Sequence, residues 1–194
     1  KTPHRPIARN PKTVTALSVC HHCGEPLPQH PVQAEFDGSA RAFCCDGCAA
    51  AAHWISDAHL GDYYRLRSAP AGRVDADAPS LAVWDREELL ASHARNVAGG
   101  REITLLTDGM RCAACAWLID RALTREAGVL DTSANAITGR IRIAWDPTQT
   151  SLSKPLARLA ALGYRPYLAT GEAREAARRR ERNRDLLRIG LAGI

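Results

Sequence analysis

The sequence lacks any apolar run long enough to cross a membrane. A spanning helix needs about 20 apolar residues, whereas only about six apolar or small residues follow the last arginine, Arg188. A secretory signal is also missing, because residues 1–11 are polar and rich in proline and residues 14–20 are too short and mixed to form an apolar signal core. We therefore expect this stretch of chain to be soluble and to meet a reducing cytosol.

The sequence also lacks a basic face, although its net charge is +5. The positive charge gathers at the two ends: four Lys and Arg in residues 1–15, and seven arginines against four acidic residues in 172–194. Residues 16–171 carry 15 basic and 17 acidic side chains. Nucleic-acid binding needs a basic surface, commonly with aromatic side chains, so we expect no nucleic-acid partner.

Cysteine is abundant by contrast, with seven residues, an odd number. Where no secretory signal is present, cysteines serve more often as metal ligands than as disulfide partners. Two of them, Cys112 and Cys115, are separated by two residues. Thiolates are soft ligands that select Cu(I), Zn and iron–sulfur clusters, and this spacing lets both sulfurs reach one ion from a single turn. The pair therefore predicts a soft-metal clamp.

The residues around this pair predict a strand before it and a helix after it. Residues 101–106 carry a short β-type run, and the apolar residues from Ala116 to Leu123 follow helical spacing. At such a turn the first N–H groups of the helix, together with Arg111, favour thiolate over thiol. We therefore expect both sulfurs to be ready ligands at neutral pH and to be reachable from solvent.

The residues that follow complete a β-α-β-β-α-β order. Two β-type runs, 129–136 and 140–145, flank a hairpin turn. A second helix begins near Ser153, the expected N-cap, and ends at Gly163, and a last strand follows at 164–169. About 70 residues in this order fit a ferredoxin-like α+β sandwich with both helices on one face of an antiparallel sheet.

The other five cysteines form two groups nearer the N-terminus. The groups are Cys20-His21-His22-Cys23-Gly24 and Phe43-Cys44-Cys45-Asp46-Gly47-Cys48. A CxxC followed by glycine forms a tight turn whose amides face sulfur, and the second group stands at the start of a helix expected over 49–60. This pattern predicts a small module of the zinc-ribbon or treble-clef kind, in which four thiolates close a tetrahedral site.

Two questions stay open at this second site. The third ligand can be Cys44 or Cys45, because both spacings to Cys48 suit a helical turn. The metal can be a structural Zn, since so short a module lacks apolar residues for its own core. It can also be a transferable Cu(I) that uses the extra thiol or a neighbouring histidine.

The histidines of this region fit other roles better than that of ligand. His21 and His22 lie between the first two cysteines and are expected at exposed polar positions. His53 and His59 belong to the following helix and are expected at the surface or in packing.

A linker with a short helix is expected between the two modules. Residues 68–81 are rich in Ala, Pro, Gly and Asp, which is a linker composition. The helix is expected to begin at Asp85, with acidic residues in its first turn, and to end at Gly99-Gly100. Its apolar edge consists of Trp84, Leu89, Leu90 and Val97. That edge must be covered, so we expect the helix to pack on a neighbouring domain.

The run Gly109-Met110-Arg111-Cys112-Ala113-Ala114-Cys115, in this element order, resembles the heavy-metal-associated domain of copper chaperones and heavy-metal P-type ATPases. The resemblance covers about residues 100–170. It implies that Cys112 and Cys115 bind Cu(I) brought by a copper-donor protein, that Met110 supports the metal loop, and that Tyr164 lies close to the sulfurs. Arg111 departs from the polar residue that is commoner at its position.

The N-terminal cysteines resemble the metal-binding domain that precedes the heavy-metal-associated domain in one subclass of copper-transporting P-type ATPases. Pumps of that subclass supply copper for a respiratory haem–copper oxidase. The resemblance rests on both cysteine groups, on Tyr63-Tyr64-Arg65-Leu66-Arg67 and on the run from Cys112 to Ile119. It implies a second site, for Zn or Cu, drawn from Cys20, Cys23, Cys44, Cys45 and Cys48.

Together the resemblances imply the cytosolic N-terminal copper-binding and regulatory region of an integral-membrane Cu(I) pump, loaded by thiolate exchange. Its partners would be the pump's own membrane and catalytic domains. The arginines from Arg174 to Arg188 would face anionic lipid on the cytoplasmic side of the inner membrane. The 194 residues contain no Asp-Lys-Thr-Gly phosphorylation motif and no nucleotide-binding loop, so we expect no enzyme activity in this fragment.

We expect five parts along the chain: a basic arm over 1–15, the Cys-rich module over 16–67, the linker over 68–99, the heavy-metal-associated domain over 100–170, and an Arg-rich helix leading toward a membrane span over 171–194. Other functions compatible with these motifs are a stand-alone copper chaperone, a zinc-ribbon adaptor and a thiol-disulfide oxidoreductase.

Overall fold

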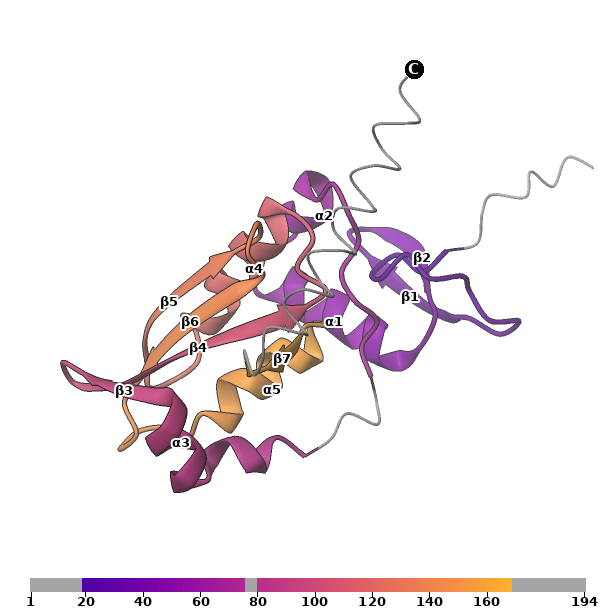
Figure 1. Ribbon diagram of the computed structural model, residues 1–194. Coiled ribbons are helices and arrows are strands. Elements are labelled where there is room, and N and C mark those ends of the chain that lie inside the picture. Colours follow the sequence, from indigo (N-terminus) through magenta and orange to yellow (C-terminus); the bar gives the residue numbers. More distant parts are fainter. Residues whose placement is uncertain (1–18, 76–79, 169–194) are drawn as a thin grey trace, which may run out of the picture.

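The computed structural model describes residues 19–75 and 80–168, which form two packed parts (Figure 1). The expected basic arm and the expected Arg-rich helix lie outside the described residues. We call residues 19–67 the Cys-rich module and residues 94–168 the sandwich. Between them run residues 68–75 and a short helical segment. Among the described residues, no helix has the length and apolar character needed to cross a bilayer.

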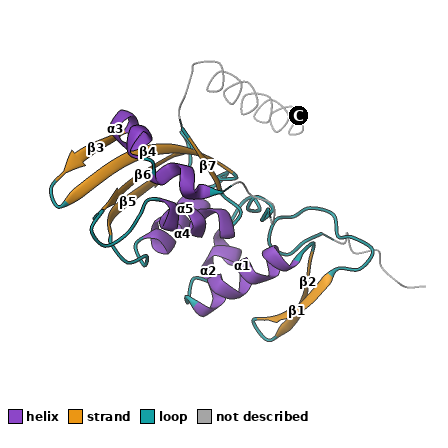
Figure 2. Cartoon of the chain, turned by 90° about the horizontal axis from the view of Figure 1, so that it is seen from below, coloured by secondary structure: helices purple, strands orange, loops and turns teal. Residues whose placement is uncertain are grey.

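The sandwich has the β-α-β-β-α-β order that the sequence predicts. Its elements are β4 (Gly100–Asp108), α4 (Ala113–Leu123), β5 (Val129–Asn135), β6 (Arg140–Trp145), α5 (Ser153–Ala161) and β7 (Arg165–Tyr167). All strand pairs are antiparallel, with β4 next to β6 and β6 next to β5, while β7 pairs with the end of β4. Helices α4 and α5 lie together on one face of this sheet (Figure 2). The ferredoxin-like α+β fold is thus confirmed.

Helix α5 is capped differently from the expectation. Ser153 is the first helical residue instead of the N-cap, which is Leu152 and makes no side-chain cap. The Ser153 amide donates a 2.8 Å hydrogen bond to Asp85 Oδ1, which lies 68 residues earlier in the chain. A free helix N-terminus needs an acceptor for its first amides, and here a distant carboxylate supplies one. The end of the helix before Gly163 is as predicted.

The linker helix is shorter than expected. Residues 81–85 form the 3-10 helix η1 (Leu81–Asp85), and α3 (Glu87–His93) ends before Gly99-Gly100. Residues 94–97 instead form β3 (Ala94–Val97), an edge strand that pairs antiparallel with the start of β4. The open edge of β4 offers unpaired backbone groups, and pairing with it satisfies them. The predicted packing is confirmed, because Trp84 and Leu90 are buried in the main core.

The Cys-rich module consists of a hairpin and two helices. Strands β1 (Val32–Phe36) and β2 (Ser39–Phe43) pair in register around Asp37-Gly38, both of which have positive φ. Such a turn twists with the strands, and glycine adopts it without strain. Helix α1 (Asp46–Asp57) follows the second cysteine group at once, and α2 (Asp62–Leu66) closes the module. Phe43, Ala52 and two cysteines, Cys20 and Cys48, are almost fully buried in its small core.

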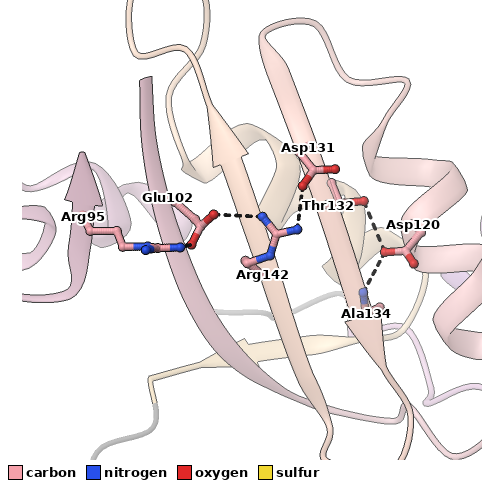
Figure 3. A network of polar contacts seen from close by, with 7 residues as sticks. All are labelled: Arg95, Glu102, Asp120, Asp131, Thr132, Ala134 and Arg142. Carbon is pink, nitrogen blue, oxygen red and sulfur yellow. Dashed lines mark hydrogen bonds and ion pairs between the residues drawn. The ribbon is translucent and has the colours of Figure 1, made fainter. Parts of the chain in front are cut away.

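A chain of charged side chains crosses the open face of the sheet (Figure 3). The Glu102 carboxylate lies between Arg95 and Arg142 at 2.6 and 2.8 Å, and Arg142 also pairs with Asp131. Burial opposes ionisation of Glu102, but the hydrogen bonds from the two arginines outweigh it and lower the pKa of the carboxyl. Beside this chain, Asp120 on α4 accepts from the Ala134 amide at 2.8 Å and from Thr132 Oγ1.

Asp120→Ala is expected to destabilise the sandwich by about 1–3 kcal/mol, because the half-buried Ala134 amide loses its partner. Burial raises the pKa of Asp120, so its charge is not itself favourable there. Asp120→Asn keeps the accepting oxygen and should lie within about 1 kcal/mol of the unchanged chain. Asp131→Ala, which removes an exposed ion pair, is the matched control, with an expected cost of about 0–1 kcal/mol. Urea unfolding followed by circular dichroism measures all three, and equal losses for Asp120→Ala and Asp131→Ala would contradict the assignment.

Candidate metal centres

Four cysteine sulfurs gather at the heart of the Cys-rich module. The Sγ atoms of Cys20, Cys23, Cys44 and Cys48 all lie within 4.8 Å of one another. Cys44 Sγ is 3.6 Å from both Cys23 Sγ and Cys48 Sγ. The four come from two separate segments, the turn before β1 and the junction of β2 with α1. The fold thus brings together the two groups that the sequence predicts as one site.

Backbone hydrogen bonds shape the first of these segments into a tight knuckle. The Cys20 amide donates to Glu25 O at 2.7 Å, and the Gly24 amide donates to Cys20 O at 2.9 Å. The His21 amide donates to Ala42 O, which ties the knuckle to β2. The second segment begins α1, since the Ala49 amide donates to Cys45 O. Each segment therefore holds its two sulfurs on a hydrogen-bonded turn.

The four sulfurs fit a tetrahedral metal. Zn–S bonds of about 2.3 Å at tetrahedral angles separate neighbouring sulfurs by roughly 3.8 Å, close to the 3.6 Å observed for the Cys44 pairs. Hydrogen bonds from Cys23 and Cys48 lower the pKa of the Cys20 thiol, and the same hydrogen bonds raise the pKa values of Cys23 and Cys48. The four thiols thus interact closely with one another, and four sulfurs so placed would suit a divalent ion at their centre.

Cys45, the alternative to Cys44, does not belong to the group of four. Its sulfur lies 3.8 Å from Cys44 Sγ and faces Val74 O at 3.9 Å. Cys45 is also the N-cap of α1, and its sulfur is not one of the four that lie within 4.8 Å of one another. The geometry therefore favours Cys44 as a ligand, a choice that the spacing left open.

The expectation that His21 and His22 are exposed is wrong. The His22 side chain is fully buried, with Nδ1 2.8 Å from Tyr64 Oη and Nε2 3.2 Å from Leu162 O. Burial lowers the pKa of His22 to about 4, so the ring is neutral and joins the Cys-rich module to the sandwich. The His21 ring stacks on Tyr64 with 4.8 Å between ring centroids. On α1, His53 and the nearby His59 are exposed, as expected.

Cys112 and Cys115 form the second candidate centre, on the loop between β4 and α4. Cys112 is the N-cap of α4, Cys115 lies in its first turn, and their sulfurs are 3.1 Å apart. Burial alone would raise the pKa of the Cys112 thiol, but hydrogen bonds from Cys115 and the backbone outweigh it and lower the pKa. Burial and the same pairing raise the pKa of Cys115. Cys112 is thus the more acidic thiol of the pair.

Met110 and Tyr164, which the resemblance associates with the metal loop, both lie in the main core. Met110 is buried in the core beneath the loop, and Tyr164 is fully buried. The Tyr164 hydroxyl is close enough to lower the pKa of Cys115, although no hydrogen bond of ordinary geometry reaches it among the described residues. It therefore offers a donor beside the sulfurs that has no other partner of good geometry.

The expectation that both sulfurs are open to solvent is wrong. Cys112 is 8 % exposed and Cys115 is not exposed at all. The residues that cover the two sulfurs lie in segments that the sequence predicts as a linker or as the end of a helix. Tyr63 on α2 is fully buried, and Ala69 O lies 3.9 Å from Cys112 Sγ. No periodicity or motif chemistry marks these residues, and only the Tyr63-Tyr64-Arg65-Leu66-Arg67 run drew attention to α2.

Comparison with known families places two domains on this chain. Residues 19–98 match the family described as "Putative metal-binding domain of cation transport ATPase", and residues 104–165 match the heavy-metal-associated domain. The chain thus carries two domains that each match a metal-binding family, and neither match is to a catalytic domain.

The relatives in this class are transport ATPases. The chain is 36% identical over 64 residues to a copper-exporting P-type ATPase of Bacillus subtilis and 41% identical over 56 residues to a zinc-transporting ATPase of Synechocystis. These matches span 33% and 29% of this chain and 8% of each relative. Among solved structures, a copper-bound CopA variant from Bacillus subtilis is 33% identical, with a TM-score of 0.33, over 36% of this chain and 92% of that one.

Proposed function

We propose that this chain is the N-terminal metal-binding region of a Cu(I)-translocating P-type ATPase, and that Cys112 and Cys115 accept its cargo. The observation that carries the proposal is the pairing of two sulfurs at 3.1 Å on the first turn of α4, in a heavy-metal-associated domain. The copper-exporting relatives support the choice of pump. The same proposal includes that the pump supplies copper for a respiratory haem–copper oxidase.

The ligand count favours Cu(I) over Zn at this pair. Among the described residues, the only group of three or more His, Cys, Asp or Glu side chains able to hold one ion is the four-cysteine site. The pair on α4 thus has two thiolates and no third ligand in the described chain. Zn takes four ligands in structural sites, whereas soft thiolates alone suit Cu(I). The zinc-transporting relative makes Zn the ion to test beside copper.

Copper would enter by thiolate exchange. A donor protein's Cu(I)–thiolate meets the Cys112 thiolate, whose pKa is lowered, and a Cu–S bond to Cys112 forms before a bond to the donor breaks. Cys115 then loses its proton to solvent and displaces the second donor sulfur, so that one Cu(I) passes and no electron moves. A linear S–Cu–S arrangement puts the two sulfurs on opposite sides of the metal, so the loop must widen from the observed 3.1 Å.

The Cys-rich module would hold a resident Zn at Cys20, Cys23, Cys44 and Cys48. Such an ion would join the knuckle to α1 and stabilise a module with a small apolar core. The remaining features of the proposal concern the whole pump: location of this region on the cytoplasmic side of the membrane, and regulation of the pump by copper occupancy.

Replacing both Cys112 and Cys115 by serine is expected to remove one tightly bound Cu(I) per chain and to leave the zinc content unchanged. Copper is titrated against a chromophoric Cu(I) chelator, and both metals are counted by elemental analysis. Cys45→Ser is the matched control, because Cys45 is half-buried and lies outside the group of four sulfurs. An unchanged copper stoichiometry in the double variant would defeat the proposal.

A further inference from the structure

The loop that carries Cys112 and Cys115 is covered by another part of the same chain. Helix α2 lies beside α4 (Figure 1), and its Tyr63 side chain is fully buried in the core cluster that contains both cysteines. Residues 68–74, which we call the strap, run on from α2 across the loop. The Cys112 thiol donates to Ala69 O at 3.9 Å, and the backbone of Ser68 and Ala69 helps to lower the pKa of Cys112.

The strap fits against the loop without room for a side chain. Gly72 lies between Gly109, which begins the metal loop, and Gly163, which precedes Tyr164. A Cβ atom added at Gly72 would stand 2.3 Å from Gly163 O, and one added at Gly163 would stand 2.1 Å from Gly72 O. Ala71, one residue earlier, is 3 % exposed and belongs to the main core. Such close contact is typical of a packed core and not of a free linker.

The far end of the strap rests on the Cys-rich module. Val74 packs against the module's core, and its carbonyl oxygen lies 3.9 Å from Cys45 Sγ. Just beyond the strap, Asp75 pairs with Arg165 on β7 at 2.9 Å. The strap therefore touches both candidate metal centres within seven residues. An open cleft of about 500 Å³ lies beside it, lined by residues that include Cys20, Arg41 and Arg67.

We propose that the strap and α2 form an intramolecular cover that closes the copper-accepting loop against a donor protein. The inference rests on the proposed function, because a cover matters only if Cys112 and Cys115 receive metal. Thiolate exchange requires the donor's sulfurs to touch Cys112 and Cys115, and Ala69, Ala71 and Gly72 occupy that approach. Loading then takes place from the population in which the strap and α2 have lifted, so the size of that population sets the rate.

The test measures how fast the two sulfurs react with N-ethylmaleimide in the copper-free 194-residue chain, with its zinc retained. Trypsin cleaves after Arg111 and Arg121, so one peptide, residues 112–121, reports on both cysteines by mass spectrometry. Gly72→Val places a side chain against Gly163 O and must displace the strap. Ala71→Glu puts a carboxylate where the strap is buried. Gly61→Ala is the control, because a Cβ at Gly61 meets nothing within 4 Å.

Both strap variants are expected to react faster in peptide 112–121. If the open form of the cover is populated at roughly 0.1–10 %, the cover slows alkylation by ~10- to 1000-fold. Displacing the strap should raise the alkylation rate by the same factor. Gly61→Ala should react at the unchanged rate. The rate of Cu(I) transfer from a chelator complex should rise by a similar factor in the same two variants, with circular dichroism unchanged.

Equal rates in all four chains, with folded spectra, would overturn the cover. That result is separate from failure of the proposed function, because alkylation is measured without copper. If the sulfurs alkylate faster in the strap variants but Cys112→Ser/Cys115→Ser leaves copper binding intact, the cover stands and the copper assignment falls. If copper binds at the pair and the strap variants alkylate no faster, the assignment stands and the cover falls.

Discussion

Cys48→Ser is expected to release the metal of the four-cysteine site and to unfold the Cys-rich module. The module's own small core holds two large apolar side chains, Phe36 and Phe43, while its Ile55, Leu60 and Tyr63 are buried in the main core. Much of its stability therefore has to come from elsewhere. Zn binding to four thiolates supplies on the order of 10 kcal/mol in small domains, and this free energy is folding free energy where the apo form is unfolded. Cys48 is fully buried and lies on α1, so its loss disconnects that helix from the knuckle.

The measurement is zinc content together with amide hydrogen exchange in β1, β2 and α1. In the variant these amides should exchange at nearly unprotected rates, while amides of β4 and β6 keep their protection. Cys45→Ser is the matched control and should retain both the zinc and the protection. If Cys45→Ser loses zinc and Cys44→Ser keeps it, Cys45 is the ligand and the assignment of Cys44 is wrong.

Trp145→Ala is expected to cost the sandwich about 3–5 kcal/mol, since truncating a large buried aromatic side chain leaves a cavity as well as losing apolar burial. Trp145 is 1 % exposed and ends β6, the strand between β4 and β5, with Arg101 and Val129 as its register partners. The loss therefore weakens the sheet at its centre. Urea unfolding by circular dichroism, with amide exchange in β4 and β6, measures it.

Trp117→Ala is the control for this prediction. Trp117 is only partly buried, at the edge of the same core, so it should cost clearly less than Trp145→Ala. Trp145→Phe refills most of the volume and should recover much of the lost stability. A Trp117→Ala loss as large as that of Trp145→Ala would show that cavity formation at β6 is not the cause.

The sandwich could be predicted from the sequence because its determinants are local. The alternation in β6, the apolar stripe of α4 and Gly163 after α5 each act within a few residues of their own position, so spacing alone reveals them. The CxxC spacing of Cys112 and Cys115 likewise brings two sulfurs together through one helical turn, whatever the rest of the chain does. The grouping of the N-terminal cysteines could be predicted for the same reason. The spacing of the first group forms a local knuckle, and that of the second group fits the start of a helix.

The features that the sequence did not reveal depend on partners far away in the chain. Ser153 is capped by Asp85, and the strand Ala94–Val97 exists because the edge of β4 is free to pair. His22 is buried because Leu162, 140 residues later, accepts from its ring. None of these side chains carries a signal of its own, since each is an ordinary polar or apolar residue until its partner is in place.

By itself, the sequence determined which sulfurs are paired and on which elements they stand, since i to i+3 spacing at a helix start is a local property of the chain. Only the tertiary structure decided whether those sulfurs meet solvent. Their burial under Tyr63, Ala69 and Gly72 depends on how one small module packs on another. Close packing of this kind follows from the shapes of distant surfaces, which no window of sequence contains.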